Sequence, residues 1–195
     1  MRKSFSTTTC FLLASFMAEA QIANNLTTIA IELFKGVKTT LSITEKNFIS
    51  QKTGFVLSGD KGQPFALDKD SKEYPFAANV LPVDLNKDGK EEVFILFGNG
   101  FTSGNTGSSV VLFIKNATGA YEMNFGFPGV MPDVLTSSNQ GFPDILIGGP
   151  GMEYPVFRWN GKLYDNYRMV KDSDYGRLKK TSVEQLSKEY VGMMK

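Results

Sequence analysis

The spacing of apolar residues predicts a helical start to the chain after its first twenty residues. Apolar side chains recur every three or four positions between residues 22 and 37, a spacing typical of an amphipathic helix. Residues 42–45, Ser-Ile-Thr-Glu, form a capping-box pattern, which predicts a second helix through residue 52. We therefore expect a helical segment over residues 21–54 that packs on a sheet.

From Phe55 onward the pattern becomes that of antiparallel β structure. Short apolar runs are separated by Gly, Pro, Asp and Lys, the punctuation expected between strands. A hairpin with an Asn-Gly turn is predicted at residues 159–164. The apolar runs cover residues 55–57, 64–67, 74–83, 93–97, 110–114 and 121–125. We expect a β-rich domain over residues 55–170 and a C-terminal helix within 171–195, where Thr181 and Ser182 supply caps.

The stretch of residues 84–92 has the pattern of a calcium-binding loop. Short oxygen-bearing side chains occupy alternate positions, Gly89 follows the third, and a carboxylate comes three residues later. A calcium ion takes ~6 to 8 oxygen ligands, and alternate residues of a tight turn can point inward together. The predicted ligands are the side chains of Asp84, Asn86, Asp88 and Glu92 with the backbone carbonyl of Lys90.

This loop is not an EF-hand, because the position that needs a bidentate Glu is held by the apolar Ile95. Its pattern, Asp-x-Asn-x-Asp-Gly-x-x-acid before an apolar strand, resembles the calcium loops of FG-GAP and VCBS-type repeats, with Glu92 in place of the commoner final Asp. The resemblance implies a structural calcium ion between propeller strands. The alternative is a polar turn without an ion, since Asx residues and Gly form turns by themselves.

A second copy of this theme follows at a constant offset of 52 residues. Residues 136–149 align with residues 84–97, which comprise the predicted calcium-binding loop (residues 84–92, the calcium-type loop) and the strand after it. Gly141 then matches Gly89, and Asp144 matches Glu92. Thr, Ser and Gln replace the first three ligand side chains, so the second loop has lost the ion site. Two units of this kind predict an α+β, mainly β fold built from two propeller-blade-like or meander repeats of antiparallel sheet.

The first twenty residues have the features of a secretory signal peptide. Arg2 and Lys3 form a basic start, residues 10–18 are mostly apolar, and Ala18-Glu19-Ala20 is an A-x-A cleavage site. The alternative is an N-terminal helix, but the apolar run is shorter than the ~20 residues that span a bilayer. We therefore predict a secreted or periplasmic protein without a membrane span, whose single cysteine, Cys10, is removed with the signal.

Charge and composition exclude several classes of function. Lys and Arg number 21 against 20 Asp and Glu, which argues against nucleic acid as the main partner. Histidine is absent, and the predicted mature chain has no cysteine. Ser-His-Asp and Cys-His nucleophile systems, and zinc or haem held by histidine or thiolate, are therefore impossible.

Residues 80–167 also resemble small secreted bacterial β-rich proteins in the order of their loops, strands and Trp-Asn-Gly hairpin. That resemblance implies no particular activity. Our leading hypothesis is a calcium-stabilised binding module without catalytic activity, whose partner is an unknown protein or glycan. Candidate contacts lie in residues 98–109, with Phe101, and in residues 148–154, with Tyr154; Trp159 is a third. Both segments are equally consistent with ordinary linkers.

Two further functions are compatible with the sequence. In a carbohydrate-binding protein, Tyr154, Trp159, Tyr164 and Tyr167 would offer ring faces to sugars, although aromatic residues in strands also build cores. In a glycoside hydrolase, two carboxylates about 5 to 9 Å apart would act without histidine. The candidate acids for such a pair are Asp133, Asp144, Glu153 and Asp165.

Overall fold

The computed structural model describes residues 25–148 and 154–194, so the predicted signal peptide lies outside the described residues. The fold is α+β and mainly β, as the sequence predicts. Its helices are α2 (Thr28–Leu33), α3 (Ile43–Thr53), α4 (Gly100–Ser103), the 3-10 turn η1 (Gly104–Thr106), α5 (Asp172–Tyr175) and α6 (Val183–Met193). Its strands are β1 (Val56–Leu57), β2 (Phe65–Ala66), β3 (Ala78–Val83), β4 (Glu92–Phe97), β5 (Ser109–Lys115), β6 (Tyr121–Pro128), β7 (Asp133–Asn139), β8 (Phe142–Leu146), β9 (Tyr154–Trp159), β10 (Tyr164–Val170) and β11 (Lys180–Ser182).

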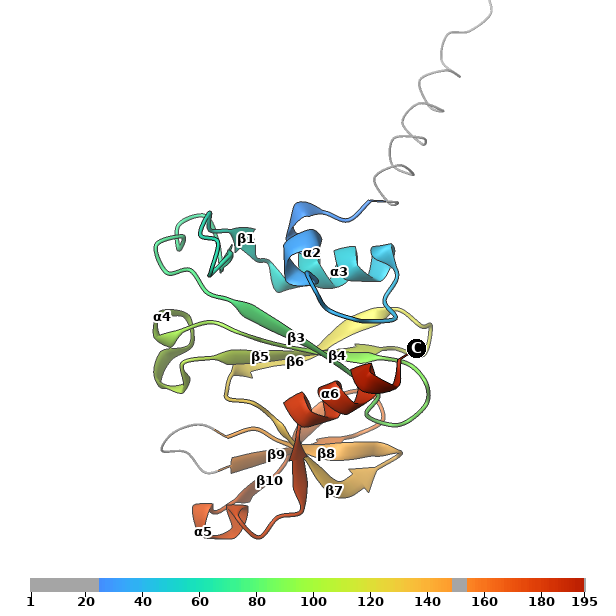
Figure 1. The fold of residues 1–195 in the computed structure, drawn as a ribbon. Coiled ribbons are helices and arrows are strands. Elements are labelled where there is room, and N and C mark those ends of the chain that lie inside the picture. The colour runs from blue at the N-terminus through green and yellow to red at the C-terminus, as the bar shows by residue number, and fades with distance from the viewer. Residues whose placement is uncertain (1–24, 149–153, 195) are drawn as a thin grey trace, which may run out of the picture.

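Two four-stranded antiparallel meanders form the body of the protein (Figure 1). The first sheet has the order β3-β4-β5-β6, and the second repeats it as β7-β8-β9-β10, with β11 added beside β7. Helices α2 and α3 cover the first sheet, and α6 lies along the side of the molecule where the two sheets face each other. The small β1-β2 ribbon extends the helical layer.

Three apolar layers hold these elements together. Alternate residues of a strand point to opposite faces of its sheet, so the first sheet buries both faces. Val93 faces the helices and packs with Ile49, whereas Phe94 faces the second sheet and packs with Ile145. A smaller cluster around Val156 lies on the outer face of the second sheet.

The pairing of the strands supports the predicted duplication. In the first hairpin Leu81 pairs with Phe94 and Pro82 with Val93, and the partners 52 residues later are also paired. Those later pairs are Asp133 with Leu146 and Val134 with Ile145. The equivalent residues Val93 and Ile145 face the first and second core respectively. The two meanders are therefore stacked in the same orientation.

Each meander contains one equivalent hydrogen bond from a tyrosine hydroxyl to a backbone carbonyl. The Tyr121 hydroxyl donates to the backbone carbonyl of Glu91 at 2.5 Å, and the Tyr164 hydroxyl donates to that of Pro143 at 2.8 Å. Glu91 and Pro143 are again 52 residues apart. Each tyrosine thus ties the last strand of its meander to the second, and this repeat was not visible in the sequence alignment of the loops.

Two of the three predicted helices agree with their sequence signals. Helix α3 has the predicted Ser42–Glu45 capping box, and α6 begins at Val183 with Ser182 as its N-cap, as predicted. Within the described residues 25–37, α2 covers only Thr28–Leu33, with the Thr27 hydroxyl accepting from the Ala30 amide at its start.

Two predicted loops contain regular structure. The glycine-rich segment after β4 folds into α4 and η1, where the Asn99 side chain accepts the amides of Phe101 and Thr102. Residues 136–139 continue β7 instead of forming a loop. Gln140 and Gly141, with φ of 49° and 85°, make the two-residue turn to β8. Two consecutive left-handed residues suit a tight hairpin.

Candidate functional site

The calcium-type loop joins β3 to β4, and its first two predicted ligands converge. The Asp84 carboxylate accepts the backbone amides of Asp88 at 3.1 Å and Gly89 at 3.0 Å. The Asn86 side-chain oxygen accepts the same Asp88 amide at 3.1 Å. Left-handed backbone at Lys87 (φ 59°) and Gly89 (φ 81°) curls the loop around these oxygens. Oxygens of Asp84 and Asn86 therefore lie close to one point.

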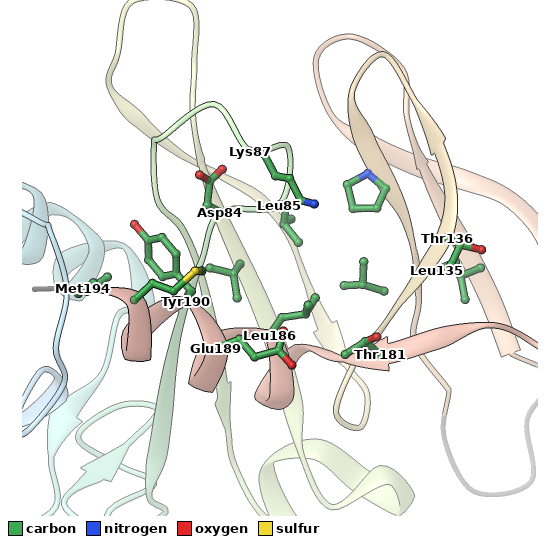
Figure 2. A pocket seen from close by; sticks show the side chains of 14 residues that line it. Asp84, Leu85, Lys87, Leu135, Thr136, Thr181, Leu186, Glu189, Tyr190 and Met194 are labelled. Carbon is green, nitrogen blue, oxygen red and sulfur yellow. The ribbon is translucent and has the colours of Figure 1, made fainter.

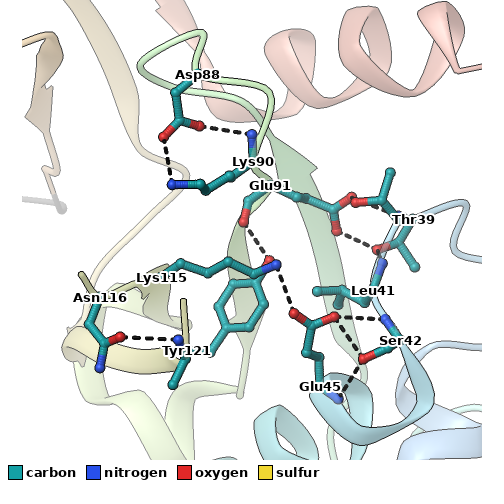
Figure 3. A network of polar contacts seen from close by, with 12 residues as sticks. Thr39, Leu41, Ser42, Glu45, Asp88, Lys90, Glu91, Lys115, Asn116 and Tyr121 are labelled. Carbon is teal, nitrogen blue, oxygen red and sulfur yellow. Dashed lines mark hydrogen bonds and ion pairs between the residues drawn. The ribbon is translucent and has the colours of Figure 1, made fainter. Parts of the chain in front are cut away.

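Asp88 is turned toward the far end of the loop. One carboxylate oxygen accepts the Lys90 amide at 2.8 Å, and the other lies 3.7 Å from the Lys90 ammonium (Figure 3). Both side chains are exposed, so this ion pair stabilises the loop only weakly. An ion that used Asp88 as a ligand would compete with Lys90 for its carboxylate.

Glu92 differs from the other predicted ligands because its side chain is only 2% exposed. One carboxylate oxygen accepts the Leu85 amide at 2.7 Å. Burial raises the pKa of Glu92 to about 8, and the charges of Asp84, Asp88 and Glu91 raise it further against the effect of the Leu85 hydrogen bond. The carboxylate at the base of the loop therefore has a high cost of ionisation when no cation is nearby.

The structure thus brings together part of the predicted ligand set. Asp84 and Asn86 converge, Glu92 is buried at the base of the loop, and Asp88 faces Lys90. Within residues 25–148 and 154–194, no three His, Cys, Asp or Glu side chains are grouped closely enough to hold a metal ion. The available donors are carboxylate and amide oxygens, the ligand type that calcium prefers.

The sequence analysis did not identify Glu91 as a structural residue. Its carboxylate is 1% exposed and accepts the Thr40 amide at 2.9 Å and hydroxyl groups of Thr39 and Thr40. Figure 3 shows these contacts beside the Tyr121 hydrogen bond. The available signal was the pair of consecutive acids at the start of β4. Adjacent residues of a strand face opposite sides of the sheet, so Glu91 and Glu92 cannot both belong to the same loop site.

Asp144, the equivalent of Glu92, has a cation of its own. Arg158 donates from Nε at 2.8 Å and from an NH₂ group at 2.7 Å, and the Ser137 hydroxyl donates at 2.5 Å. Burial alone would raise the pKa of Asp144, but the hydrogen bonds and charge of Arg158 lower it. Arg158 lies in β9 and points to the outer face of the second sheet. Its guanidinium carbon also lies 3.6 Å from the centroid of the Tyr167 ring.

The three predicted partner-contact residues lie in different places. Phe101 is 62% exposed and stacks on Tyr74 with the ring centroids 3.4 Å apart. Trp159 is half-buried and stacks on Phe142 at 4.4 Å. Tyr154 stacks on a neighbouring tyrosine at 4.3 Å. Phe101 is therefore the most accessible of the three.

The carboxylates considered for hydrolysis have structural partners. Asp133 accepts the Tyr175 hydroxyl at 2.7 Å, and Asp144 is occupied by Arg158. The Asp165 carboxylate accepts the amide of the next residue at 2.8 Å. Glu153 lies outside the described residues.

A cavity of about 790 Å³ adjoins the calcium-type loop (Figure 2). Its walls come from the loop, from β7 and from α6, which crosses beneath them. The lining is mainly aliphatic and thioether, with Lys87 and Asp84 on the loop side. The volume lies within the ~300 to 1,000 Å³ typical of small-molecule sites.

Comparisons with protein-family models, with curated proteins and with solved structures found no match to this chain. The fold and the loop define the protein as a stacked pair of β-meanders, with a carboxylate-lined loop between β3 and β4 of the first meander. None of the helices in the described part of the chain is long and apolar enough to cross a membrane.

Proposed function

We propose that this protein is an exported, non-catalytic β-rich binding module whose first meander is stabilised by calcium. The ion would be held by the side chains of Asp84, Asn86, Asp88 and Glu92 and by the Lys90 carbonyl. Its resident role is structural, because it would fix the β3-β4 loop to the strand that follows. The predicted signal peptide supports export to the periplasm or the exterior.

The observation that carries this proposal is the difference between Glu92 and Asp144. Both are buried acids at the same place in equivalent hairpins. Asp144 is neutralised by Arg158, whereas Glu92 makes no ion pair within the described residues. A buried carboxylate is stable in its charged form only with a compensating cation. A calcium ion in the loop would supply that charge.

The binding role is proposed on the exposed aromatic surface near the same sheet. Phe101 and Tyr74 form a stacked pair at the end of β4, and the Asn99 side chain holds the two loops together by donating to the Pro75 carbonyl at 2.9 Å. Exposed aromatic residues on rigid loops are frequent contact points for partners. The partner would be a protein or a glycan.

The test is a thermal melt of the purified protein at pH 7.5 with calcium and with chelator. Calcium at ~100 times its dissociation constant is expected to add about 2.7 kcal/mol, which for this size raises Tm by about 5 to 10 °C. Glu92→Gln keeps the side-chain shape and removes the charge, so it should abolish the calcium response and raise Tm in chelator.

The matched control is Asp60→Asn. Asp60 also accepts backbone amides in a turn, from Gly62 at 2.7 Å and Gln63 at 2.8 Å, but it lies outside the loop. This variant should keep the full calcium response. Coincident midpoints for the wild-type protein in calcium and chelator would refute the calcium proposal.

A further inference from the structure

The cavity beside the calcium-type loop has an apolar interior and a charged edge. Val134, Leu135, Leu186 and Met193 contribute to its apolar lining. Residues of this type offer dispersion contacts to an aliphatic chain but few hydrogen bonds. The occupant that fits such a lining is a molecule with an extended apolar part.

The charged residues at the edge decide which polar group this molecule carries. The Asp84 carboxylate already accepts two loop amides, and Glu189 accepts the Gln185 side-chain amide at 2.7 Å. Lys87 forms no hydrogen bond or ion pair with any other described residue through its ammonium group. Figure 2 shows its side chain extending from the loop over Leu85 toward the space between the loop and β7.

We propose that this cavity binds an aliphatic monocarboxylate of the fatty-acid type, with its chain between α6 and β7 and its carboxylate on Lys87. Lys87 is the only basic residue in the cavity lining within the described part of the chain. A charge-assisted hydrogen bond from an ammonium to a carboxylate is stronger than one between neutral groups. The inference does not depend on calcium, although the same loop supplies one wall.

The experiment is calorimetric titration of the protein with decanoate in chelator, compared with decanol and decyltrimethylammonium. We expect decanoate to bind at least about tenfold more tightly than either, the factor that one charge-assisted hydrogen bond provides. Equal binding of all three probes, or no binding of decanoate, would overturn the proposal. Because calcium is absent, failure here is distinct from failure of the calcium proposal.

Two variants locate the site. Lys87→Gln should weaken decanoate about tenfold and leave decanol unchanged. Thr136→Trp, on the exposed surface of β7, should place its ring in the cavity beside the apolar lining and weaken binding of both. Lys188→Gln is the charge-matched control, because Lys188 is an exposed α6 residue that pairs with Glu184 outside the cavity. Unchanged decanoate affinity in Lys87→Gln would refute the assigned carboxylate contact.

A second copy of the chain is the competing occupant. Sedimentation of the wild-type protein should show a monomer over the concentrations of the titration. A dimer that Thr136→Trp dissociates would overturn the proposal in favour of self-association through this groove.

Discussion

Each meander has a buried acid at the same position, but among the described residues only the acid of the second meander is paired with a cationic side chain. In the second, Asp144 lies under the Arg158 guanidinium with two hydrogen bonds of 2.7 and 2.8 Å. In the first, Glu92 lies between the two sheets. Val93 pairs with Phe113 and its equivalent Ile145 pairs with Phe157, so the counterpart of Arg158 is Ile114, which is 4% exposed in the central core. The first meander therefore has no guanidinium at this position. Its buried carboxylate is either protonated, as its raised pKa of about 8 favours, or compensated by the calcium ion that we propose in the loop.

This difference follows from the position of each sheet in the stack. The face that carries Asp144 and Arg158 is the outer face of the molecule, where a long cation keeps part of its surface in water. The equivalent face of the first sheet is covered by the second sheet. The two meanders thus differ at this position because their surroundings differ, although the strand register is retained.

The largest expected effect is a pH-dependent difference in the free energy of unfolding between the wild-type protein and Glu92→Gln, both measured in chelator. The pKa of Glu92 rises from 4.5 unfolded to about 8 folded, so the folded state holds the proton more tightly. The wild type should match the variant near pH 4.5 and lose stability relative to it as pH rises to 8. The full shift corresponds to on the order of 5 kcal/mol.

Denaturant unfolding of both proteins at several pH values measures this difference. Added calcium should reverse the trend above pH 7, because the ion binds the ionised carboxylate. A difference that stays constant from pH 4.5 to 8 would mean that Glu92 titrates normally.

The next largest effect is expected from Arg158→Met. This change leaves Asp144, which is fully buried, without its cation, and should cost about 3 kcal/mol in the free energy of unfolding. Chemical denaturation gives the value. The double variant with Asp144→Asn should lose less than the sum of the two single changes, because both belong to one ion pair. Additive losses would show that the pair is not coupled.

The tyrosine hydrogen bonds test whether the two meanders are equally constrained. Tyr121→Phe and Tyr164→Phe each remove one hydroxyl donor from a backbone carbonyl, and each should cost about 1 kcal/mol. Thermal or denaturant unfolding measures both. A loss confined to one variant would show that only one meander depends on this contact.

The smallest effect is expected when the three ligand side chains of the first loop are introduced at the equivalent positions of the second. The variant Thr136→Asp, Ser138→Asn, Gln140→Asp should bind no calcium by calorimetry. These residues lie in a continuous strand and a two-residue turn, and Arg158 already occupies Asp144. Calcium binding by this variant would mean that side chains alone, without the eight-residue loop, form the site.

Much of the fold could be predicted from the sequence because its signals are local. The Ser42–Glu45 capping box and the hairpin at residues 159–164 depend on neighbouring residues, and both are confirmed. The repeat at an offset of 52 predicted two meanders. Residues 136–139 were wrongly predicted as a loop, because Thr and Ser suit a strand as well as a turn and only pairing with β8 decides between them.

The candidate site was less accessible to sequence reasoning. The spacing of Asp84, Asn86 and Asp88 predicts a curled loop, but the burial of Glu92 depends on the second sheet. The role of Arg158 could not be inferred, since its contact with Asp144 spans 14 positions and two strands. The cavity depends on α6, whose place against β3 is a long-range contact.

Stacking in a single direction leaves each meander with a surface that fits a further copy, so an uncapped pair could grow into an open array. Here both ends are closed. Helices α2 and α3 cover the outer side of the first sheet, and Tyr175 of α5 packs with the apolar cluster around Val156 on the outer side of the second. Terminal caps of this kind keep repeat proteins soluble. The α5 segment thus covers the apolar part of the outer face of the second sheet.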